Sequence, residues 1–169
     1  MAVDIDKVAQ EAIDAISEKI KNLNALNIIV AGKTGVGKST LINAVFRDKF
    51  AETGMGKPVT DHMRKISKKG IPLAIYDTKG FELGKEVQQQ VKQEVMETIS
   101  KGLATQDINK AIHCIWYCIN TASNRVEPEE IEWLKELSQE NQITQVPIIV
   151  VLTQSFSKKN ADAMRKMIL

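Results

Sequence analysis

The chain has few cysteines, no long apolar run and almost no net charge, and each of these absences excludes a class of protein. Cys114 and Cys118 are the only two cysteines, and no nearby set of ligand side chains accompanies them. The sequence therefore predicts buried free thiols rather than a disulfide framework or a metal site. No apolar run approaches the roughly 18 residues of a membrane-spanning helix, and the first residues lack a charged-then-apolar signal pattern, so we expect a cytoplasmic protein.

The charge balance is close to neutral, since 23 Lys and Arg against 21 Asp and Glu give a net charge of +2. Such a balance does not indicate nucleic acid or an anionic membrane as the main partner. The 169 residues are 43% apolar and 26% charged, which suffices for one sizeable core. The sequence contains no internal repeat or low-complexity segment, and nothing in it suggests a second core. We expect a helical extension over residues 1–25 and one domain over residues 26–169.

Helical and strand patterns alternate along the chain, which predicts an α/β fold with a mostly parallel sheet between layers of helices. An apolar stripe from Ile5 to Leu23 predicts an amphipathic helix before the first strand, formed by Ile5, Val8, Ala12, Ile13, Ile16, Ile20 and Leu23. The remaining elements expected are strands over 27–31, 111–119 and 146–152, helices over 38–47, 85–101 and 128–139, and the beginning of a helix over 157–169.

Four details of this pattern are specific enough to be tested. Residues 51–63 contain glycine and proline and predict a long loop. An antiparallel hairpin is expected to turn at Gly70, with 71–76 as its outgoing strand. The helix over 85–101 is expected to stop at Gly102. The continuous apolar run from Val146 to Leu152 is typical of a central, buried strand.

The stretch AGKTGVGKSTL follows the apolar run 26–30 and precedes another apolar segment, so it is expected to join a strand to a helix. Glycines at this spacing let the backbone turn tightly and direct several N–H groups at one anion. Lys38 adds a charge for the outer phosphates, and Ser39 can place its hydroxyl on Mg²⁺. A glycine-rich turn without a ligand is the alternative. The residues expected to contact phosphate are Gly32, Lys33, Thr34, Gly35, Val36, Gly37, Lys38, Ser39 and Thr40.

A second motif, D-x-x-G, occupies residues 77–80. An aspartate at a strand tip opposite a phosphate loop can hold Mg²⁺ through water, and the backbone N–H of Gly80 can meet a terminal phosphate. The motif alone also describes an ordinary turn. Its position about 40 residues after the phosphate loop and after an antiparallel hairpin favours the binding role for Asp77 and Gly80.

With these two motifs, residues 26–169 resemble the translation-factor-like class of P-loop GTPases. The resemblance implies a three-layer P-loop NTPase fold, GTP and GDP as substrate and product, and Mg²⁺ as cofactor. It also implies that the loop before the hairpin is a first switch, in which Thr60 joins Mg²⁺ only when the third phosphate is present. Thr53 is a competing candidate, and a plain loop threonine is the alternative. Residues 77–84 would be the second switch.

The chain departs from Ras-like members directly after D-x-x-G. Those members carry a glutamine that orients the attacking water, whereas this chain carries Phe81, whose ring cannot hydrogen-bond that water. Phe81 therefore resembles the branch of GTPases with an apolar residue here, in which hydrolysis relies on other groups that a partner molecule often supplies. Packing of Phe81 against the sheet edge is compatible with this interpretation.

The base-reading loop also departs from the class. Most members use N/T-K-x-D, whose carboxylate pairs with guanine; here Thr153 matches, but Gln154 replaces the lysine and Phe156 stands where the aspartate belongs. Together with Ser155, this modified loop resembles that of Toc and AIG-type GTPases, which still use guanine nucleotides. The phosphate loop is also similar to that group, to septins and to immunity-related GTPases. Thr153, Gln154 and Ser155 are therefore expected to contact the nucleotide.

Residues 120–134 resemble a stretch of Toc-type GTPases in which an arginine reaches toward the partner's nucleotide in a face-to-face dimer. Arg125 matches that arginine. The alternative is a solvated arginine that pairs with Glu127 or Glu129, since such surface pairs are common.

The first functional hypothesis is a slowly hydrolysing, GTP-binding switch on the septin, Toc and dynamin-like side of the class, acting through nucleotide-dependent dimerisation. Catalysis would involve Lys38, Thr60, Gly80 and Arg125, and the metal would be held by Ser39 and Thr60, with Asp77 acting through water. A nucleotide-binding module without turnover is the second hypothesis, and a P-loop ATPase or kinase is the third. We expect the sequence to be part of a longer chain that continues into a further strand, base loop and helix, with any membrane-binding segment outside it.

Overall fold

The computed structural model describes residues 23–50, 56–81, 84–123 and 125–168, together with residues 7, 10, 11, 13–15, 18 and 21. Six strands and four longer helices follow one another in these residues, with a short 3₁₀ turn, η1. The elements are β1 (Leu26–Ala31), α2 (Lys38–Phe46), β2 (Lys57–Thr60), β3 (Met63–Ser67), β4 (Leu73–Thr78), α3 (Gly84–Ala104), β5 (Cys114–Asn120), η1 (Thr121–Ser123), α4 (Pro128–Glu140), β6 (Ile148–Thr153) and α5 (Lys158–Ile168).

The strands form one sheet in the order β2-β3-β4-β1-β5-β6. The β1 strand lies between β4 and β5 and is parallel to both, and β6 is parallel to β5. The β3 strand is antiparallel to β4, and the turn between them contains Gly70 with φ 86°. The predicted mostly parallel sheet with an antiparallel hairpin at Gly70 is therefore confirmed.

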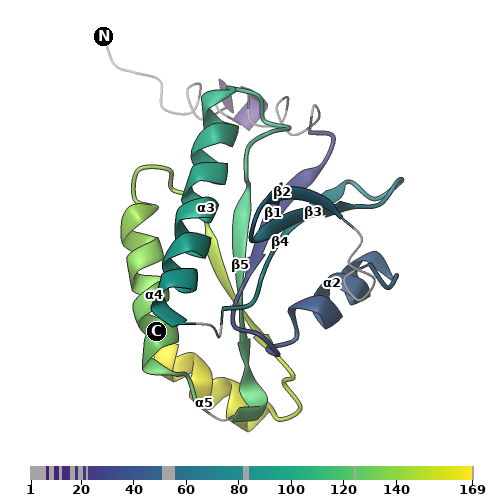
Figure 1. Ribbon diagram of the computed structural model, residues 1–169. Coiled ribbons are helices and arrows are strands. Elements are labelled where there is room, and N and C mark those ends of the chain that lie inside the picture. Colours follow the sequence, from purple (N-terminus) through teal and green to yellow (C-terminus); the bar gives the residue numbers. More distant parts are fainter. Residues whose placement is uncertain are drawn as a thin grey trace.

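Helices cover both faces of the sheet, with α2 on one face and α3 and α4 on the other (Figure 1). Because successive side chains of a strand point to opposite faces, β1 contributes to both cores. Ile28 and Val30 pack in the core with Ile42 of α2, whereas Ile29 and Ala31 belong to the core on the other face. The carboxyl end of β1 thus emerges between two filled layers, and the phosphate-loop sequence begins there.

The prediction of a continuous loop over residues 51–63 is wrong for its second half. Residues 51–55 lie outside the described residues, but Lys57–Thr60 form the edge strand β2, which pairs antiparallel with β3 and shifts register between Pro58 and Thr60. Proline is tolerated there because an edge strand leaves one row of N–H groups unpaired. The strand forms through its pairing with β3, which local sequence pattern does not reveal.

Two further element predictions are corrected. The α3 helix continues through Gly102 to Ala104; a Cβ at Gly102 would lie 2.6 Å from the carbonyl oxygen of Lys110, so close packing, not helix termination, explains this glycine. The β6 strand lies at the edge of the described sheet, not at its centre, and Ile149 is 48% exposed. Ile148, Val150 and Leu152 pack against the core on one face of the sheet and Val151 against the core on the other, so the apolar run reflects partly buried side chains on both faces.

The described positions before residue 23 are helical, and Ile13 among them is 56% exposed. The other residues of the predicted stripe before Leu23, namely Ile5, Val8, Ala12, Ile16 and Ile20, lie outside the described residues. Among the described helices, none combines the length and the apolar character that crossing a membrane requires.

The two cysteines are buried free thiols on β5, as predicted.

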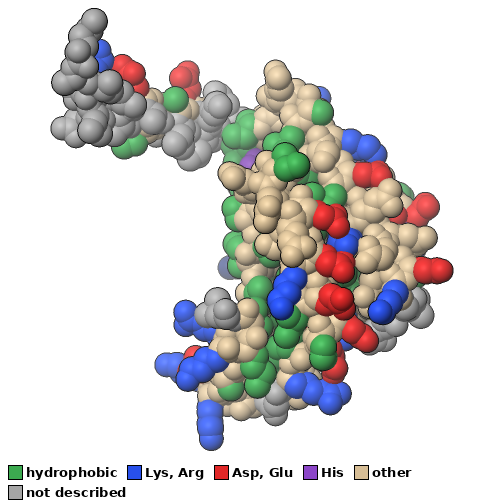
Figure 2. All heavy atoms as spheres, turned by 90° about the vertical axis from the view of Figure 1, so that its left-hand side faces the viewer, with side chains coloured by type: hydrophobic (Ala, Val, Ile, Leu, Met, Phe, Trp, Pro, Cys, Tyr) green, Lys and Arg blue, Asp and Glu red, His purple; other side chains and the backbone are tan. Residues whose placement is uncertain are grey.

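On the opposite side of the sheet from α2, acidic side chains gather on the surface formed by α3 and α4 (Figure 2). Lys92 of α3 lies 2.5 Å from a carboxylate oxygen of Glu136 and 3.0 Å from one of Glu140, both on α4. This bridge ties the two helices together on that face.

Candidate functional site

The phosphate loop joins β1 to α2 and has the backbone shape that its glycines predict. Gly32, Gly35 and Gly37 have φ values of 142°, 75° and 95°, a region that residues with a side chain rarely adopt. At Gly32 an added Cβ would also lie 2.6 Å from the carbonyl oxygen of Cys118 on β5. The loop therefore curls tightly over the end of the sheet at the amino end of α2.

Lys38, the first residue of α2, turns back over this loop. Its side chain is buried, and Nζ donates hydrogen bonds of 2.8 Å to the carbonyl oxygens of Gly32 and Lys33. These bonds hold the ammonium group at the mouth of the loop, where the helix amino terminus adds its own positive partial charge. The arrangement presents concentrated positive potential to an anion.

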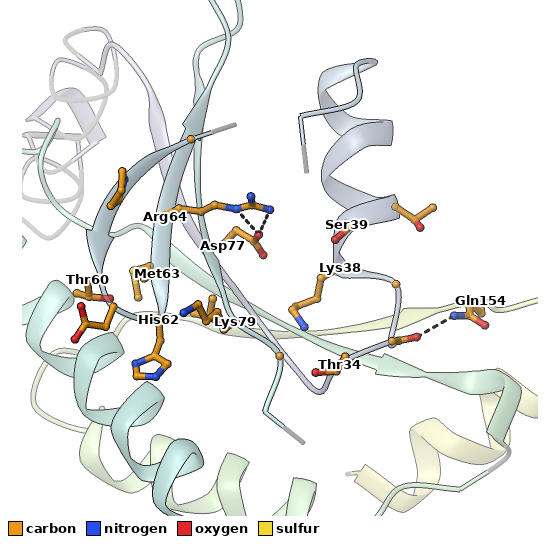
Figure 3. A pocket seen from close by; sticks show the side chains of 18 residues that line it. Thr34, Lys38, Ser39, Thr60, His62, Met63, Arg64, Asp77, Lys79 and Gln154 are labelled. Atoms are coloured by element: carbon orange, nitrogen blue, oxygen red, sulfur yellow. Dashed lines mark hydrogen bonds and ion pairs between the residues drawn. The ribbon is translucent and has the colours of Figure 1, made fainter. Parts of the chain in front are cut away.

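A pocket of about 630 Å³ opens beside the loop. Three further segments line it: β2 and the start of β3, the D-x-x-G motif at the end of β4, and Gln154 after β6 (Figure 3). The predicted site residues that line it are Thr34, Gly35, Gly37, Lys38, Ser39, Thr40, Thr60, Asp77, Gly80 and Gln154. The structure thus brings together residues from both motifs and from the predicted first switch.

Gly80 of the D-x-x-G motif lies directly against the phosphate loop. A Cβ at this position would lie 2.6 Å from both the backbone N and the Cα of Thr34. Real Cβ contacts are not that short, so only glycine fits without displacing the loop. The contact explains why a glycine follows Asp77 at this spacing, and it holds the backbone of the two motifs side by side.

Asp77, at the end of β4, faces the pocket and is paired with Arg64 of β3 (Figure 3). Nε and Nη2 of Arg64 donate hydrogen bonds of 3.1 and 2.9 Å to Oδ2 of Asp77. Burial raises the pKa of Asp77 above its ordinary value, while Arg64 and Lys38 act in the opposite direction. The carboxylate is therefore a nearly enclosed negative charge that depends on neighbouring cations.

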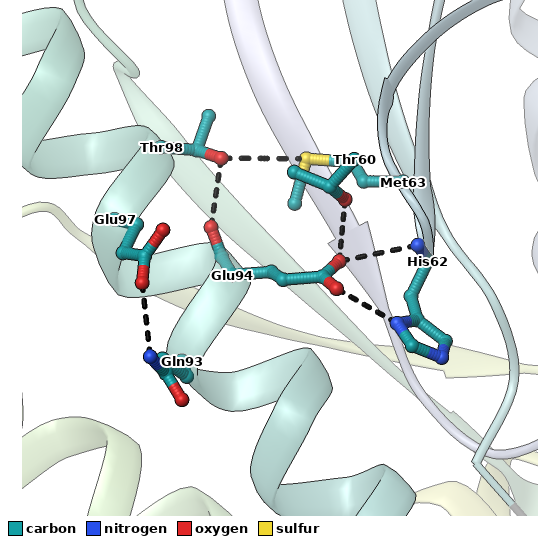
Figure 4. A network of polar contacts seen from close by, with 7 residues as sticks. All are labelled: Thr60, His62, Met63, Gln93, Glu94, Glu97 and Thr98. Carbon is teal, nitrogen blue, oxygen red and sulfur yellow. Dashed lines mark hydrogen bonds and ion pairs between the residues drawn. The ribbon is translucent and has the colours of Figure 1, made fainter.

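Thr60 lines the same pocket, but its hydroxyl group donates a hydrogen bond to the carboxylate of Glu94 in α3 (Figure 4). His62 binds the same carboxylate through its backbone N at 3.2 Å and through Nδ1 at 2.7 Å. Burial acts to raise the pKa of Glu94, but the hydrogen bonds from His62 and Thr60 outweigh it and hold the pKa below its ordinary value. Glu94 thus anchors the end of β2 to α3.

The sequence motifs missed Arg64, His62 and Glu94. His62 and Arg64 follow the predicted switch threonine. Polar residues at the start of a short strand are common, so they do not indicate a site. Glu94 lies in the middle of a charged helix surface and carries no motif at all. Only the tertiary contacts of Arg64 with Asp77 and of His62 with Glu94 reveal the three residues.

Phe81 points away from the pocket. Its ring is 1% exposed and stacks on Trp133 of α4 with a centroid distance of 4.9 Å, next to Tyr117 of β5 at 6.3 Å. The packing interpretation is therefore confirmed, although the ring lies in the core beneath α4 and not at the sheet edge. No water-orienting side chain is supplied by this position.

Thr153 and Gln154 contact the phosphate loop from the end of β6. The Thr153 hydroxyl lies within hydrogen-bonding distance of the carbonyl oxygens of Val36 and Ile119, and Nε2 of Gln154 lies 3.5 Å from the carbonyl oxygen of Gly35. Phe156 is 90% exposed. Thr153 and Gln154 therefore support the phosphate loop. Ser155 is exposed and does not line the pocket.

Arg125 lies outside the pocket and is 74% exposed. Its Nε lies 2.8 Å from a carboxylate oxygen of Glu127, the residue that caps α4. Within this chain the side chain thus adopts the alternative arrangement, a solvated ion pair.

Four other predicted site residues do not line the pocket but form or support the phosphate loop: Gly32, Lys33, Val36 and Thr153.

The oxygen donors around the pocket fit one kind of metal ion. Ser39 and Thr60 supply hydroxyl groups and Asp77 supplies a carboxylate, which are hard ligands of the kind that Mg²⁺ prefers. Within the described residues, no group of three or more His, Cys, Asp or Glu side chains could hold a metal alone. The donor set therefore fits Mg²⁺ held jointly with phosphate oxygens.

Known proteins are similar to this chain in sequence. A family model described as 50S ribosome-binding GTPase matches residues 27–154. Septin-4 of Homo sapiens is 33% identical over 144 residues, a match that covers 72% of this chain and 30% of septin-4. The chain spans 28 to 30% of the length of the septin-9 and septin-4 relatives that it matches.

Two solved structures share the fold at low sequence identity. Toc33 of Arabidopsis thaliana in complex with Mg²⁺ and GMPPNP is 22% identical, with a TM-score of 0.54 over 90% of this chain and 65% of that one. A structure of the chloroplast translocon components atToc33 and psToc159, for which dimerisation is important for the GTPase activity, is 19% identical, with a TM-score of 0.59 over 90% and 64%. The family model covers the phosphate loop, the D-x-x-G motif and most of the sheet, so this chain belongs to the 50S ribosome-binding GTPase family and has the fold of a P-loop GTPase.

Proposed function

We propose that this chain binds GTP and GDP with Mg²⁺ and hydrolyses GTP slowly, as a nucleotide-dependent switch. The observation that carries the proposal is the contact of Gly80 with Thr34, which joins the D-x-x-G motif to the phosphate loop within one pocket. Lys38 and the amides of residues 32–37 would hold the outer phosphates. The backbone N–H of Gly80 lies in the segment that would meet the third phosphate.

Ser39, Thr60 and Asp77 are the residues that would hold Mg²⁺, Asp77 through water. The ion would neutralise charge on the outer phosphates when bound. Thr60 is the residue whose position would depend on the third phosphate, because it lies at the end of β2, just before the β3 strand that carries Arg64. Thr60 lies across the pocket from Ser39 (Figure 3), so the end of β2 would have to move toward the phosphate loop to serve this role, and the hydrogen bond to Glu94 opposes that movement.

Slow turnover follows from the position of Phe81. Its ring is buried against Trp133 and supplies no group that could orient water. A missing group supplied by a second molecule would raise the rate. The structure of atToc33 and psToc159, for which dimerisation is important for the GTPase activity, supports a dimer here, and we propose that it depends on nucleotide. Arg125 is the candidate side chain, since it is exposed and follows β5 and η1 closely in the chain. The same burial of Phe81 favours a second candidate function, nucleotide binding without turnover.

Three measurements on one preparation test the proposal. Thermal unfolding is followed with GTP, GDP, ATP and a non-hydrolysable GTP analogue, because a ligand that binds only the folded state raises the unfolding temperature. Phosphate release measures turnover, and phosphate transfer to an added acceptor identifies a kinase. Binding of the guanine nucleotides with slow phosphate release is the expected result. Binding without phosphate release would indicate the second candidate, and a shift with ATP alone would contradict the proposal.

Lys38→Ala is the matched variant for this experiment. We expect it to abolish the shift with triphosphate, because it removes the charge held at the mouth of the loop. Lys101→Ala is the control, since Lys101 lies on α3, is 77% exposed and pairs only at 3.4 Å with Glu97. A shift in Lys38→Ala equal to that in Lys101→Ala would overturn the assignment of the phosphate loop.

A further inference from the structure

Arg64 contacts the carboxylate that the proposed function assigns to Mg²⁺. Two of its N–H groups converge on Oδ2 of Asp77, and the side chains of Arg64 and Asp77 are 26% and 9% exposed. Both residues line the pocket. The guanidinium group reaches from β3 into the space between Asp77 and the start of α2, where Ser39 is found (Figure 3).

The backbone ladder between β3 and β4 extends to both sides of the pair. Arg64 and Asp77 stand directly opposite each other in an antiparallel ladder that already runs from the Met63–Thr78 pair to the Ser67–Ala74 pair. The next residue on β3, Lys65, points to the other face, where its Nζ lies 5.1 Å from the centre of the Tyr76 ring. The side chain of Arg64 therefore acts within the pocket, and Lys65 offers a matched control on the same strand.

The contact between Arg64 and Asp77 bears on metal binding through the negative charge of the carboxylate. Asp77 is an enclosed carboxylate whose negative charge is offset by Arg64 first and by Lys38 at longer range. A divalent cation next to Asp77 would offset the same charge, and two cations drawn to one carboxylate repel each other. An arginine bound in this way stabilises the carboxylate when metal is scarce and opposes metal binding when it is present.

We propose that Arg64 competes with Mg²⁺ for Asp77 and so sets the Mg²⁺ concentration at which this protein holds its nucleotide. The inference rests on the proposed function and deepens it. In the absence of metal, Arg64 supplies the positive charge that allows Asp77 to lie near the phosphates. When Mg²⁺ binds, the guanidinium group leaves Oδ2 and stays within the pocket, close to the outer phosphates.

The test measures binding of a fluorescent GDP analogue to wild type, Arg64→Gln, Arg64→Lys and Lys65→Gln, with free Mg²⁺ buffered over a wide range. For Arg64→Gln, the Mg²⁺ concentration that gives half-maximal binding should fall about five- to tenfold, because a competing charge-assisted contact is removed. With chelator present, the same variant should bind the analogue several-fold more weakly than wild type. Lys65→Gln should match wild type in both conditions.

These two opposite changes separate competition from simple structural support. If Arg64 only supports Asp77, Arg64→Gln will need more Mg²⁺, not less, and the inference is overturned; an unchanged Mg²⁺ requirement overturns it as well. Arg64→Lys keeps the charge but loses the paired N–H geometry, so it should show a smaller shift in the same direction if Arg64→Gln does not fold. Absence of binding by wild type at every Mg²⁺ concentration would instead contradict the proposed function.

Discussion

The hydroxyl of Thr60, at the end of β2, is hydrogen-bonded to the carboxylate of Glu94 in the middle of α3. His62 binds the same carboxylate at 2.7 Å through its side chain (Figure 4). Thr60 lies across the pocket from Ser39, the other hydroxyl proposed as a metal ligand (Figure 3). For the two hydroxyl oxygens to meet at one ion, the end of β2 would have to move toward the phosphate loop, and the contact with Glu94 opposes this movement.

Replacing Glu94 with alanine should therefore favour the triphosphate form. The substitution removes the acceptor that holds Thr60, and the preference for a non-hydrolysable GTP analogue over GDP should rise about three- to tenfold, the size of one or two hydrogen bonds. The measurement is the ratio of the two dissociation constants. Glu97→Ala is the control, because Glu97 lies one turn further along α3 and pairs with Lys101 at the surface. An unchanged ratio in Glu94→Ala would show that the contact does not restrain the switch.

Gly80→Ala should weaken nucleotide binding by displacing the phosphate loop. The added methyl group would meet the backbone of Thr34 at 2.6 Å, and overpacking of this kind costs about 1–3 kcal/mol. Gly70→Ala provides the contrast: Gly70 has φ +86° but open space around it, so it should cost about 1 kcal/mol of stability and leave affinity for GDP unchanged. Chemical unfolding and GDP titration of both variants separate the two effects. Equal GDP affinities in the two variants would contradict the role assigned to Gly80.

Arg125→Ala should leave the stability of the folded protein almost unchanged. The side chain is 74% exposed and its pair with Glu127 contributes about 0–1 kcal/mol. With a GTP analogue bound, however, the variant should self-associate less than wild type, as measured by sedimentation. Arg165→Ala, an exposed arginine on α5, is the control. If wild type and both variants dimerise and hydrolyse GTP equally, Arg125 is only a surface residue.

Cys118 should be protected from alkylation in the folded protein. Burial raises the pKa of its thiol from an ordinary 9.0 to about 11, so at pH 8 roughly one thiol in a thousand is ionised. The folded state keeps a proton that the unfolded chain releases, so this group's contribution to stability is lost as pH rises from about 9 towards 11. The reaction of iodoacetamide with a Cys114→Ala variant, in buffer and in urea, checks this. Equal rates in both would mean that the thiol is accessible in the folded protein.

The phosphate loop could be predicted in detail because its geometry depends on residues that are adjacent in the chain. Glycines at 32, 35 and 37 permit backbone angles that other residues resist, and a lysine that follows them directly can turn back over the loop. The D-x-x-G motif was located for a similar reason, since its position at the end of a strand follows from the apolar pattern before it. The helix from Pro128 also begins where predicted, because its capping signals are local.

The strand order and the environment of the site could not be predicted in the same way. An apolar run such as Val146–Leu152 indicates that a strand has partly or fully buried side chains. The place of that strand at the edge of the described sheet depends on which strands pair. The edge strand β2 likewise exists through its partner β3. The role of Gly102 also depends on the backbone of Lys110, which approaches it only in the folded chain.

The sequence by itself determined that this chain has a loop and a helix amino terminus suited to phosphate, with Asp77 and Gly80 placed to complete the pocket. The tertiary structure alone decided which groups hold the switch and metal residues. Thr60 meets Glu94 across 34 positions of sequence, and Asp77 meets Arg64 only because β3 and β4 pair in one particular register. Backbone preferences act between neighbours along the chain and can be read from residue types, whereas these contacts depend on how separate elements pack against one another.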